Sequence, residues 1–148
     1  MAYSNALAAY RQTRIKTAGQ GQLIIMLYDG AVMNIDRALE LIKMPSGKKR
    51  DPARIEQISK AVLKSQEIIT ELMVSLDFEK GGEIASNLFS IYTWFNKELL
   101  EANMSFDEER LMSVRKMICD LRGAWVEVIA LTAADERKAT PQGVSLAG

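Results

Sequence analysis

The segment Leu23–Val32 constrains the fold most, because it is too apolar for an ordinary surface helix. In a helix that turns about 100° per residue, apolar residues from Ile24 onward recur at the three- and four-residue spacing of a bundle core. Further apolar residues flank this row on both sides, so the apolar arc covers roughly 200°, against roughly 100° for a helix that faces one core. This helix therefore needs cover on more than one side. The row is Ile24, Tyr28, Ala31, Ile35, Ala38 and Ile42, and the flanks are Ile25, Val32 and Leu39 on one side and Leu23, Leu27 and Leu41 on the other.

Helix start and stop signals predict four helices and no strand. The first is expected from about Gln22 to Lys43, after a break at Gly19 and Gly21. Asp51-Pro52 marks the start of the second, an N-cap acceptor followed by a proline at the first helical position. We expect the second helix to end with the segment Asp77–Lys80, before Gly81-Gly82. Short connections between such helices favour an all-α, antiparallel, up-down four-helix bundle.

The third helix is predicted from about Glu83 to Asn103, and a capping box formed by Ser105 and Glu108 opens the fourth. Each later helix has its own apolar row, which predicts the residues that it buries. These rows are Ile55, Ile58, Val62, Ile69, Leu72 and Leu76 in the second helix, Ile84, Leu88, Ile91, Phe95, Leu99 and Ala102 in the third, and Leu111, Val114, Ile118, Leu121, Trp125 and Val128 in the fourth.

Three regions follow from these boundaries: an N-terminal arm (residues 1–20), the bundle (21–134) and a disordered C-terminal tail (135–148). The tail is predicted because helical periodicity is lost from Asp135 onward. The arm carries Leu7 and Tyr10, which would share one face of a helical turn. We expect the arm to act as a removable lid over an apolar groove, with Ile15 packing near the start of the first helix.

Composition excludes several classes of function. The chain has no histidine, which removes phosphoacceptor-histidine relays, Glu-x-x-His di-iron sites and histidine-activated nucleophiles. Nineteen basic residues balance nineteen acidic ones, so the net charge gives no general attraction to nucleic acid, and we predict no nucleic-acid binding. A single cysteine, with no signal peptide and no apolar run of membrane-spanning length, indicates a cytoplasmic protein without membrane insertion. We predict no catalytic residue, no metal site and no cofactor.

The third helix also carries more apolar surface than its own row requires. Phe89 and Leu100 lie to one side of that row and Trp94 lies to the other. Such a surplus must be covered by a partner helix, by a second copy of the chain or by the arm.

Several short sequences are spread in order along the chain: Tyr10-Arg11, Thr17-Ala18, Leu23-Ile24, Met26–Ala31, Glu79–Ala85, Asn87-Leu88, Tyr92, Ala102-Asn103 and Ala124-Trp125. Together they resemble the FliS family of flagellar export chaperones. One departure is Gly19-Gln20-Gly21, where that family usually has a serine or aspartate and a proline. The resemblance implies a non-enzymatic chaperone that binds the C-terminal segment of flagellin, prevents its premature assembly and delivers it to the flagellar export gate.

Nine residues from the arm and the apolar surplus are the predicted client-binding set. Two alternatives stay open: a helical-bundle dimerisation or regulatory module with no flagellin client, and an enzyme, although carboxylates such as Asp29 and Glu83 show no metal-ligand or acid–base partner in the sequence. A homodimer of the free protein is also left open. The predicted client-binding residues are Leu7, Tyr10, Ile15, Leu23, Leu27, Tyr28, Phe89, Trp94 and Leu100.

Overall fold

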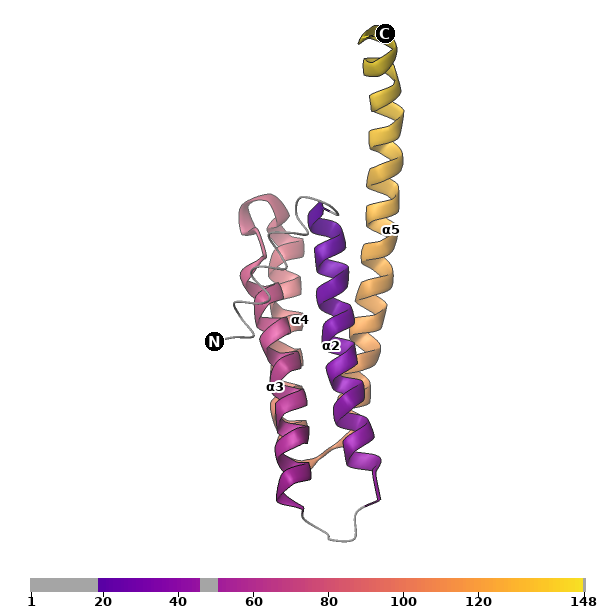
Figure 1. Ribbon diagram of the computed structural model, residues 1–148. Coiled ribbons are helices and arrows are strands. Elements are labelled where there is room, and N and C mark those ends of the chain that lie inside the picture. Colours follow the sequence, from indigo (N-terminus) through magenta and orange to yellow (C-terminus); the bar gives the residue numbers. More distant parts are fainter. Residues whose placement is uncertain (1–18, 46–50, 148) are drawn as a thin grey trace. The chain divides into compact units, whose positions relative to one another are not determined.

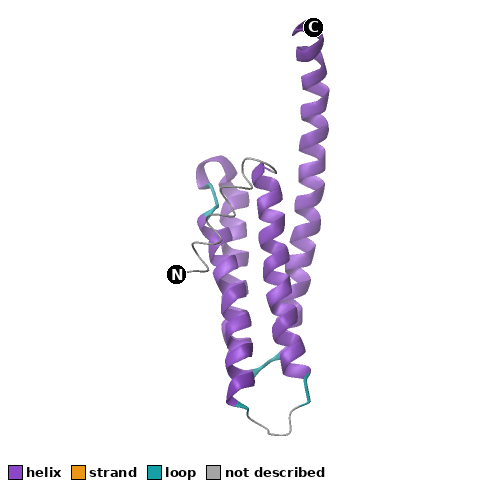
Figure 2. Cartoon of the chain, viewed as in Figure 1, coloured by secondary structure: helices purple, strands orange, loops and turns teal. Residues whose placement is uncertain are grey.

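The computed structural model describes residues 19–45 and 51–147, with side chains described as far as Ala134. All regular structure within these ranges is helical, and the described part contains no strand (Figures 1 and 2). The predicted all-α fold class is therefore confirmed. None of the described helices is long and apolar enough to cross a membrane. The helices are α2 (Gly19–Lys43), α3 (Pro52–Val74), α4 (Phe78–Ser105) and α5 (Glu108–Ala147).

The chain divides into two compact units by its internal contacts. Residues 26–119 form one unit, which holds most of α2, all of α3 and α4 and the first turns of α5. In the described chain, the other unit combines residues 19–25 with residues 120–147. The first unit contains a segment of every described helix, so it forms a helical bundle by itself.

Helices α3 and α4 form an antiparallel hairpin in the 26–119 unit (Figure 1). The hydroxyl of Ser59 donates to Asn103 Oδ1 at 3.1 Å. Further along the pair, Gln66 Nε2 donates to the carbonyl oxygen of Asn96 at 3.1 Å. As the residue number rises on α3 it falls on α4, which is the up-down arrangement that the short connections predicted.

Helix α2 contacts each of the other three helices of this unit, which accounts for its wide apolar arc. Leu27 is only 5% exposed, and Leu39 and Leu41 are buried together with the row from Tyr28 to Ala38. The chain itself therefore covers this surface. Three contacts identify the neighbours: Ser65 Oγ on α3 donates to the carbonyl of Ala31 at 3.0 Å, the hydroxyls of Tyr28 and Tyr92 on α4 are 2.6 Å apart, and Arg115 Nε on α5 donates to Asp36 Oδ1 at 2.6 Å.

The boundary between α3 and α4 differs from the prediction. Asp51 does cap α3, since its side chain accepts the amide of Ala53, but that helix already ends at Val74. Asp77 is the N-cap of α4, because its Oδ1 accepts the amides of Glu79 and Lys80 at 3.0 Å. Assigning Asp77–Lys80 to the end of the preceding helix was wrong, because an aspartate in extended conformation satisfies the free amides of a new helix.

Gly82 lies at a kink between a short first helical segment and the main body of α4, at the glycine pair that the sequence predicted as a break. Its backbone angles (φ 49°, ψ −123°) are non-helical and lie where residues with a Cβ are strained. In a straight helix Phe78 and Phe89 would be roughly 16 Å apart along the axis. Here their ring centroids lie 6.0 Å apart in an edge-to-face arrangement. The bend thus returns the first turn of α4 onto the main body of that helix.

The capping residue of α5 is also not the predicted one. Ser105 still belongs to α4, where its hydroxyl donates to the carbonyl of Glu101 at 3.1 Å. Phe106, with φ 55°, ends α4 in the left-handed conformation. Asp107 Oδ1 accepts the amide of Arg110 at 3.2 Å, so Asp107 takes the capping role that the sequence assigned to Ser105.

The predicted apolar rows are largely buried, with exceptions on α4 and α5. Ile84 is 70% exposed at the bent end of α4, whereas Tyr92, which the row omitted, is buried. On α5, Leu111, Val114 and Ile118 are fully buried and Leu121 and Trp125 are half-buried, but Val128 is 50% exposed. Val128 lies beyond residue 119, outside the unit in which four helices surround one core.

The unit of residues 19–25 and 120–147 contains the start of α2 and the later part of α5. Helix α2 begins at Gly19, so Gly21 lies within the helix and does not break it. A Cβ on Gly21 would lie 2.8 Å from the Ile129 side chain, which indicates that glycine allows the start of α2 to approach α5 closely. The α5 backbone is helical to Ala147, whereas the sequence predicted a disordered tail over residues 135–148. Helical periodicity of apolar residues is not required for helical backbone.

Candidate interaction surface

The outer side of the α3–α4 hairpin carries two matching rows of side chains, which we call the hairpin strip. Within each row the spacing is i, i+4, i+7 and i+11, so its members lie along one side of their helix. Each row is apolar at both ends and polar in the middle. The α3 row is Leu63, Glu67, Thr70 and Val74, and the α4 row is Phe89, Thr93, Asn96 and Leu100.

The ends of the hairpin strip form two exposed apolar clusters. Extending the hydrogen-bonded register of the hairpin places Leu63 level with Leu100, and Val74 level with Phe89. These side chains are 51%, 52%, 72% and 43% exposed, respectively. Phe78 adds to the second cluster through its contact with Phe89 and is itself exposed. Large apolar side chains are thus gathered at two places on a surface that the bundle core does not cover.

The middle of the hairpin strip has polar groups whose hydrogen bonding is incomplete. Thr70 and Thr93 donate their hydroxyl protons to carbonyls of their own helices, at 2.9 and 2.8 Å. Asn96 Nδ2 donates across the hairpin to Thr70 Oγ1 at 3.3 Å. Glu67 Oε2 and Asn96 Oδ1 are buried acceptors for which the described structure contains no donor. Most buried polar atoms in proteins are paired, so these two acceptors are unusual.

The predicted client-binding residues fall into three groups. Phe89 and Leu100 lie on the hairpin strip, whereas Trp94 is half-buried, with its ring centroid 5.8 Å from that of Phe95. Leu23, Leu27 and Tyr28 are 5%, 5% and 0% exposed, so they belong to the interior of this structure rather than to a free surface. The third group, Leu7, Tyr10 and Ile15, lies outside the described residues, and its role stays a prediction.

Three residues of the exposed clusters were not predicted: Leu63, Val74 and Phe78. Leu63 and Val74 interrupt the polar side of α3 at positions eleven residues apart. Apolar residues left over after the core row of α3 was assigned would have been the signal for both. Phe78 could not be found in this way, because the bend at Gly82 decides where it lies.

Tyr28 and Tyr92 form a buried polar pair inside the bundle. Their hydroxyl oxygens are 2.6 Å apart and their ring centroids 6.5 Å apart. Burial raises the pKa of Tyr92 above the ordinary value of 10.0, and the hydrogen bond to Tyr28 acts in the opposite direction. Tyr92 therefore keeps its proton at neutral pH, and the hydrogen bond of the pair joins α2 to α4.

Stability should fall at alkaline pH because of Tyr92. Its raised pKa means that the unfolded chain loses this proton first, so the stabilisation is complete below about pH 10 and is lost as pH rises through the folded-state value. Tyr92→Phe should cost about 1 kcal/mol at neutral pH through the lost hydrogen bond, but should decline less steeply above about pH 10. Urea unfolding of both proteins from about pH 8 to about pH 11 measures this. Parallel pH dependences would contradict the prediction.

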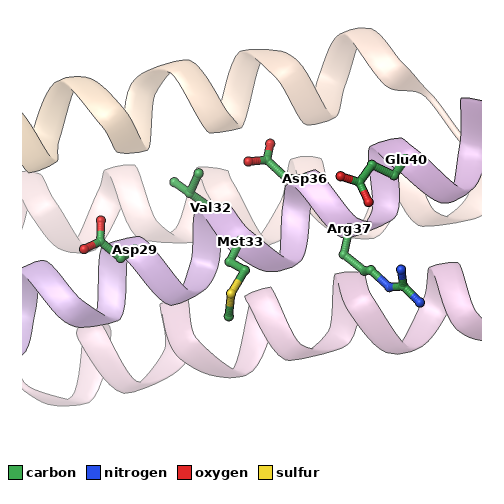
Figure 3. A pocket seen from close by; sticks show the side chains of 6 residues that line it. All are labelled: Asp29, Val32, Met33, Asp36, Arg37 and Glu40. Carbon is green, nitrogen blue, oxygen red and sulfur yellow. The ribbon is translucent and has the colours of Figure 1, made fainter.

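A shallow groove of about 430 Å³ runs along α2. Figure 3 shows Asp29, Val32 and Asp36 on one side of the helix and Met33 and Arg37 on the other. Asp36 is paired with Arg115, which raises the pKa of that arginine through a hydrogen bond. The charges spread along the helix instead of converging on one point. Among the described residues, no group of three or more metal-ligating side chains could hold a metal ion.

Comparison with known proteins shows the family of this chain. A family model described as "Flagellar protein FliS" matches residues 3–132. The chain belongs to the FliS family. A Bacillus subtilis relative named flagellar secretion chaperone FliS is 30% identical over 129 residues, covering 87% of this chain and 90% of the relative. Relatives of the same name from Salmonella typhimurium and Campylobacter jejuni are 32% and 34% identical, covering 84% and 83% of this chain and 90% of each relative.

The family match confirms the resemblance predicted from the sequence. It extends over nearly the whole chain, including all of α2, α3 and α4. The family is one of flagellar secretion chaperones, which is consistent with a non-enzymatic protein.

Proposed function

We propose that this protein is a cytoplasmic export chaperone that binds the C-terminal helical segment of flagellin. Binding would prevent premature polymerisation of flagellin, and the complex would be delivered to the flagellar export gate. Two observations support the proposal. Relatives of this chain are named flagellar secretion chaperones, and the apolar clusters of the hairpin strip lie exposed outside the buried core of the bundle.

The single observation that carries the proposal is the exposure of Leu63, Val74, Phe89 and Leu100 on one hairpin. The terminal regions of flagellin form coiled-coil helices in the filament, so before assembly their apolar faces are uncovered. A chaperone surface with exposed apolar clusters can cover such a face until export. No reacting group is needed for this activity, because it consists of covering a surface.

Co-purification tests the proposal. The full-length chain is co-expressed with a C-terminal fragment of flagellin from the same organism, and the mixture is analysed by size exclusion with light scattering. We expect a complex with one copy of each chain. A fragment that elutes separately, together with a homodimer that persists on dilution, would instead favour the dimerisation module and contradict a flagellin client.

A further inference from the structure

We infer that the outer side of α2 is a self-association surface, on which α2 of a second copy of this chain lies antiparallel. The surface is a row of four side chains, Met33, Arg37, Glu40 and Met44, which we call the α2 row. No residue of the α2 row belongs to the hairpin strip, so the inference goes beyond the proposed function and does not depend on it. It names both the partner and the residues that pair.

The four side chains of the α2 row lie along one exposed side of the helix. Met33 and Met44 are 67% and 57% exposed, and Arg37 and Glu40 are exposed between them. Met44 follows the last residue of α2, but its amide still donates to the carbonyl of Glu40 at 3.0 Å, so the row continues to this position. The spacing of four, three and four residues is that of a coiled-coil seam, which needs a second helix to cover it.

The α2 row is complementary to itself when its direction is reversed. The midpoint between Met33 and Met44 is also the midpoint between Arg37 and Glu40. In an antiparallel pair, a two-fold axis through that point places Met33 opposite Met44 of the second copy, and Arg37 opposite Glu40 of the second copy. Symmetry repeats each pairing. Methionines therefore meet at both ends of the contact, and opposite charges meet twice in its middle.

The charges of the α2 row are available for pairing with a second copy. Arg37 and Glu40 form no ion pair within the described part of the chain. Asp36, by contrast, is already paired with Arg115 on α5. Charged residues at seam positions lower the affinity of a helix pair but specify its register. A helix of unrelated sequence would have to carry the same two charges in reversed order, which a second copy does by symmetry.

The groove along α2 gives the second copy a place to pack. Three residues of the α2 row line it together with Val32, and Met33 and Arg37 lie on one side of the helix with Val32 on the other (Figure 3). Methionine is flexible and polarisable, so it adapts to such a shallow surface. The row is roughly 16 Å long, a length over which helices at a near-antiparallel crossing stay in contact. One helix side of this length buries less than a standard interface, so the dimer should be weak.

Sedimentation equilibrium of the full-length chain tests the surface. We expect a monomer–dimer equilibrium with a dissociation constant on the order of 10 μM. Arg37→Glu should weaken the dimer more than tenfold, because it places two glutamates opposite each other. Glu40→Arg should do the same by placing two arginines opposite each other. The double variant Arg37→Glu/Glu40→Arg exchanges the charges, so its dissociation constant should return to within about threefold of the original.

Lys60→Glu is the matched control. Lys60 is an exposed residue of α3 whose ion pair with Glu56 lies outside the α2 row. Its substitution changes the net charge by the same amount as Arg37→Glu does, so it should leave self-association unchanged if the position of the charge matters. The melting temperature of each variant shows that the bundle is intact.

Four results would overturn the inference. The first is a chain that stays monomeric up to about 200 μM, roughly twenty times the expected dissociation constant. The second is a dimer that is unaffected by Arg37→Glu and Glu40→Arg. The third is a double variant that dimerises as weakly as the single ones, because the two residues then do not face each other. The fourth is weaker binding of the flagellin fragment by monomeric Arg37→Glu, which would assign the α2 row to the client.

These results are distinguishable from a failure of the proposed function. The flagellin fragment is titrated at a chain concentration at which the dimer has dissociated, and Arg37→Glu should bind it as tightly as the unchanged chain does. If the unchanged chain does not bind the fragment, the proposed function fails, while the charge exchange still decides whether the α2 row joins two copies.

Discussion

Leu27→Asp is expected to lower the free energy of unfolding by about 4 kcal/mol, because it places a carboxylate in the interior of the bundle. Leu27 is 5% exposed, on a helix that contacts three others within residues 26–119. The sequence predicted Leu27 to be a client-binding residue, whose substitution would weaken binding. The structure predicts instead that the fold is lost first. Urea unfolding followed by circular dichroism gives the free energy.

Met112→Asp is the control for this experiment. Met112 is 53% exposed on α5, and the introduced carboxylate would lie one helical turn from Arg115 and Lys116. The loss of stability should be less than about 1 kcal/mol, as for most surface substitutions. Similar losses for the two variants would mean that Leu27 is not part of the core.

Phe95→Ala is expected to lower the free energy of unfolding by about 4 kcal/mol, through lost burial and the cavity that remains. Phe95 is 0% exposed, and its ring centroid lies 6.2 Å from that of Tyr92. Phe89→Ala, six residues earlier on the same helix, should cost less than about 1 kcal/mol, because Phe89 is 43% exposed. The same urea titration of the two variants measures the difference.

The two variants should affect binding of the flagellin fragment in the reverse order of their effects on stability. Phe89→Ala removes a side chain of the hairpin strip, whereas Phe95 points into the core. At a temperature where both variants are folded, only Phe89→Ala should weaken binding directly. Equal stability losses for Phe95→Ala and Phe89→Ala would contradict the division of α4 into a core side and an exposed side.

Local signals in the sequence determined the number of helices and most of the core. Asp51-Pro52 identified the start of α3, and the row from Tyr28 to Ala38 identified the buried side of α2. Both signals act over one or two helical turns, because an N-cap satisfies amides of its own helix and an apolar row shows which side of that helix avoids water. The family resemblance was also readable at this level, and the family match confirms it.

The exact ends of helices needed the structure. Asp77 and Asp107 are the residues whose side chains accept the free amides of α4 and α5. Ser105, two residues before Asp107, offered an equally good capping pattern in the sequence. Backbone conformation decides between such candidates, since Phe106 in the left-handed conformation ends one helix before the next begins.

The sequence by itself determined that α2 and α4 carry more apolar surface than one core requires. Only the tertiary structure decided which of the two surpluses is covered. Helix α2 contacts three other helices, so Leu27 is buried, whereas Phe89 and Leu100 lie on the outer side of the hairpin and stay exposed. The physical reason is that an apolar residue has the same preference for burial in either place, and its exposure depends on which helices the fold brings beside it.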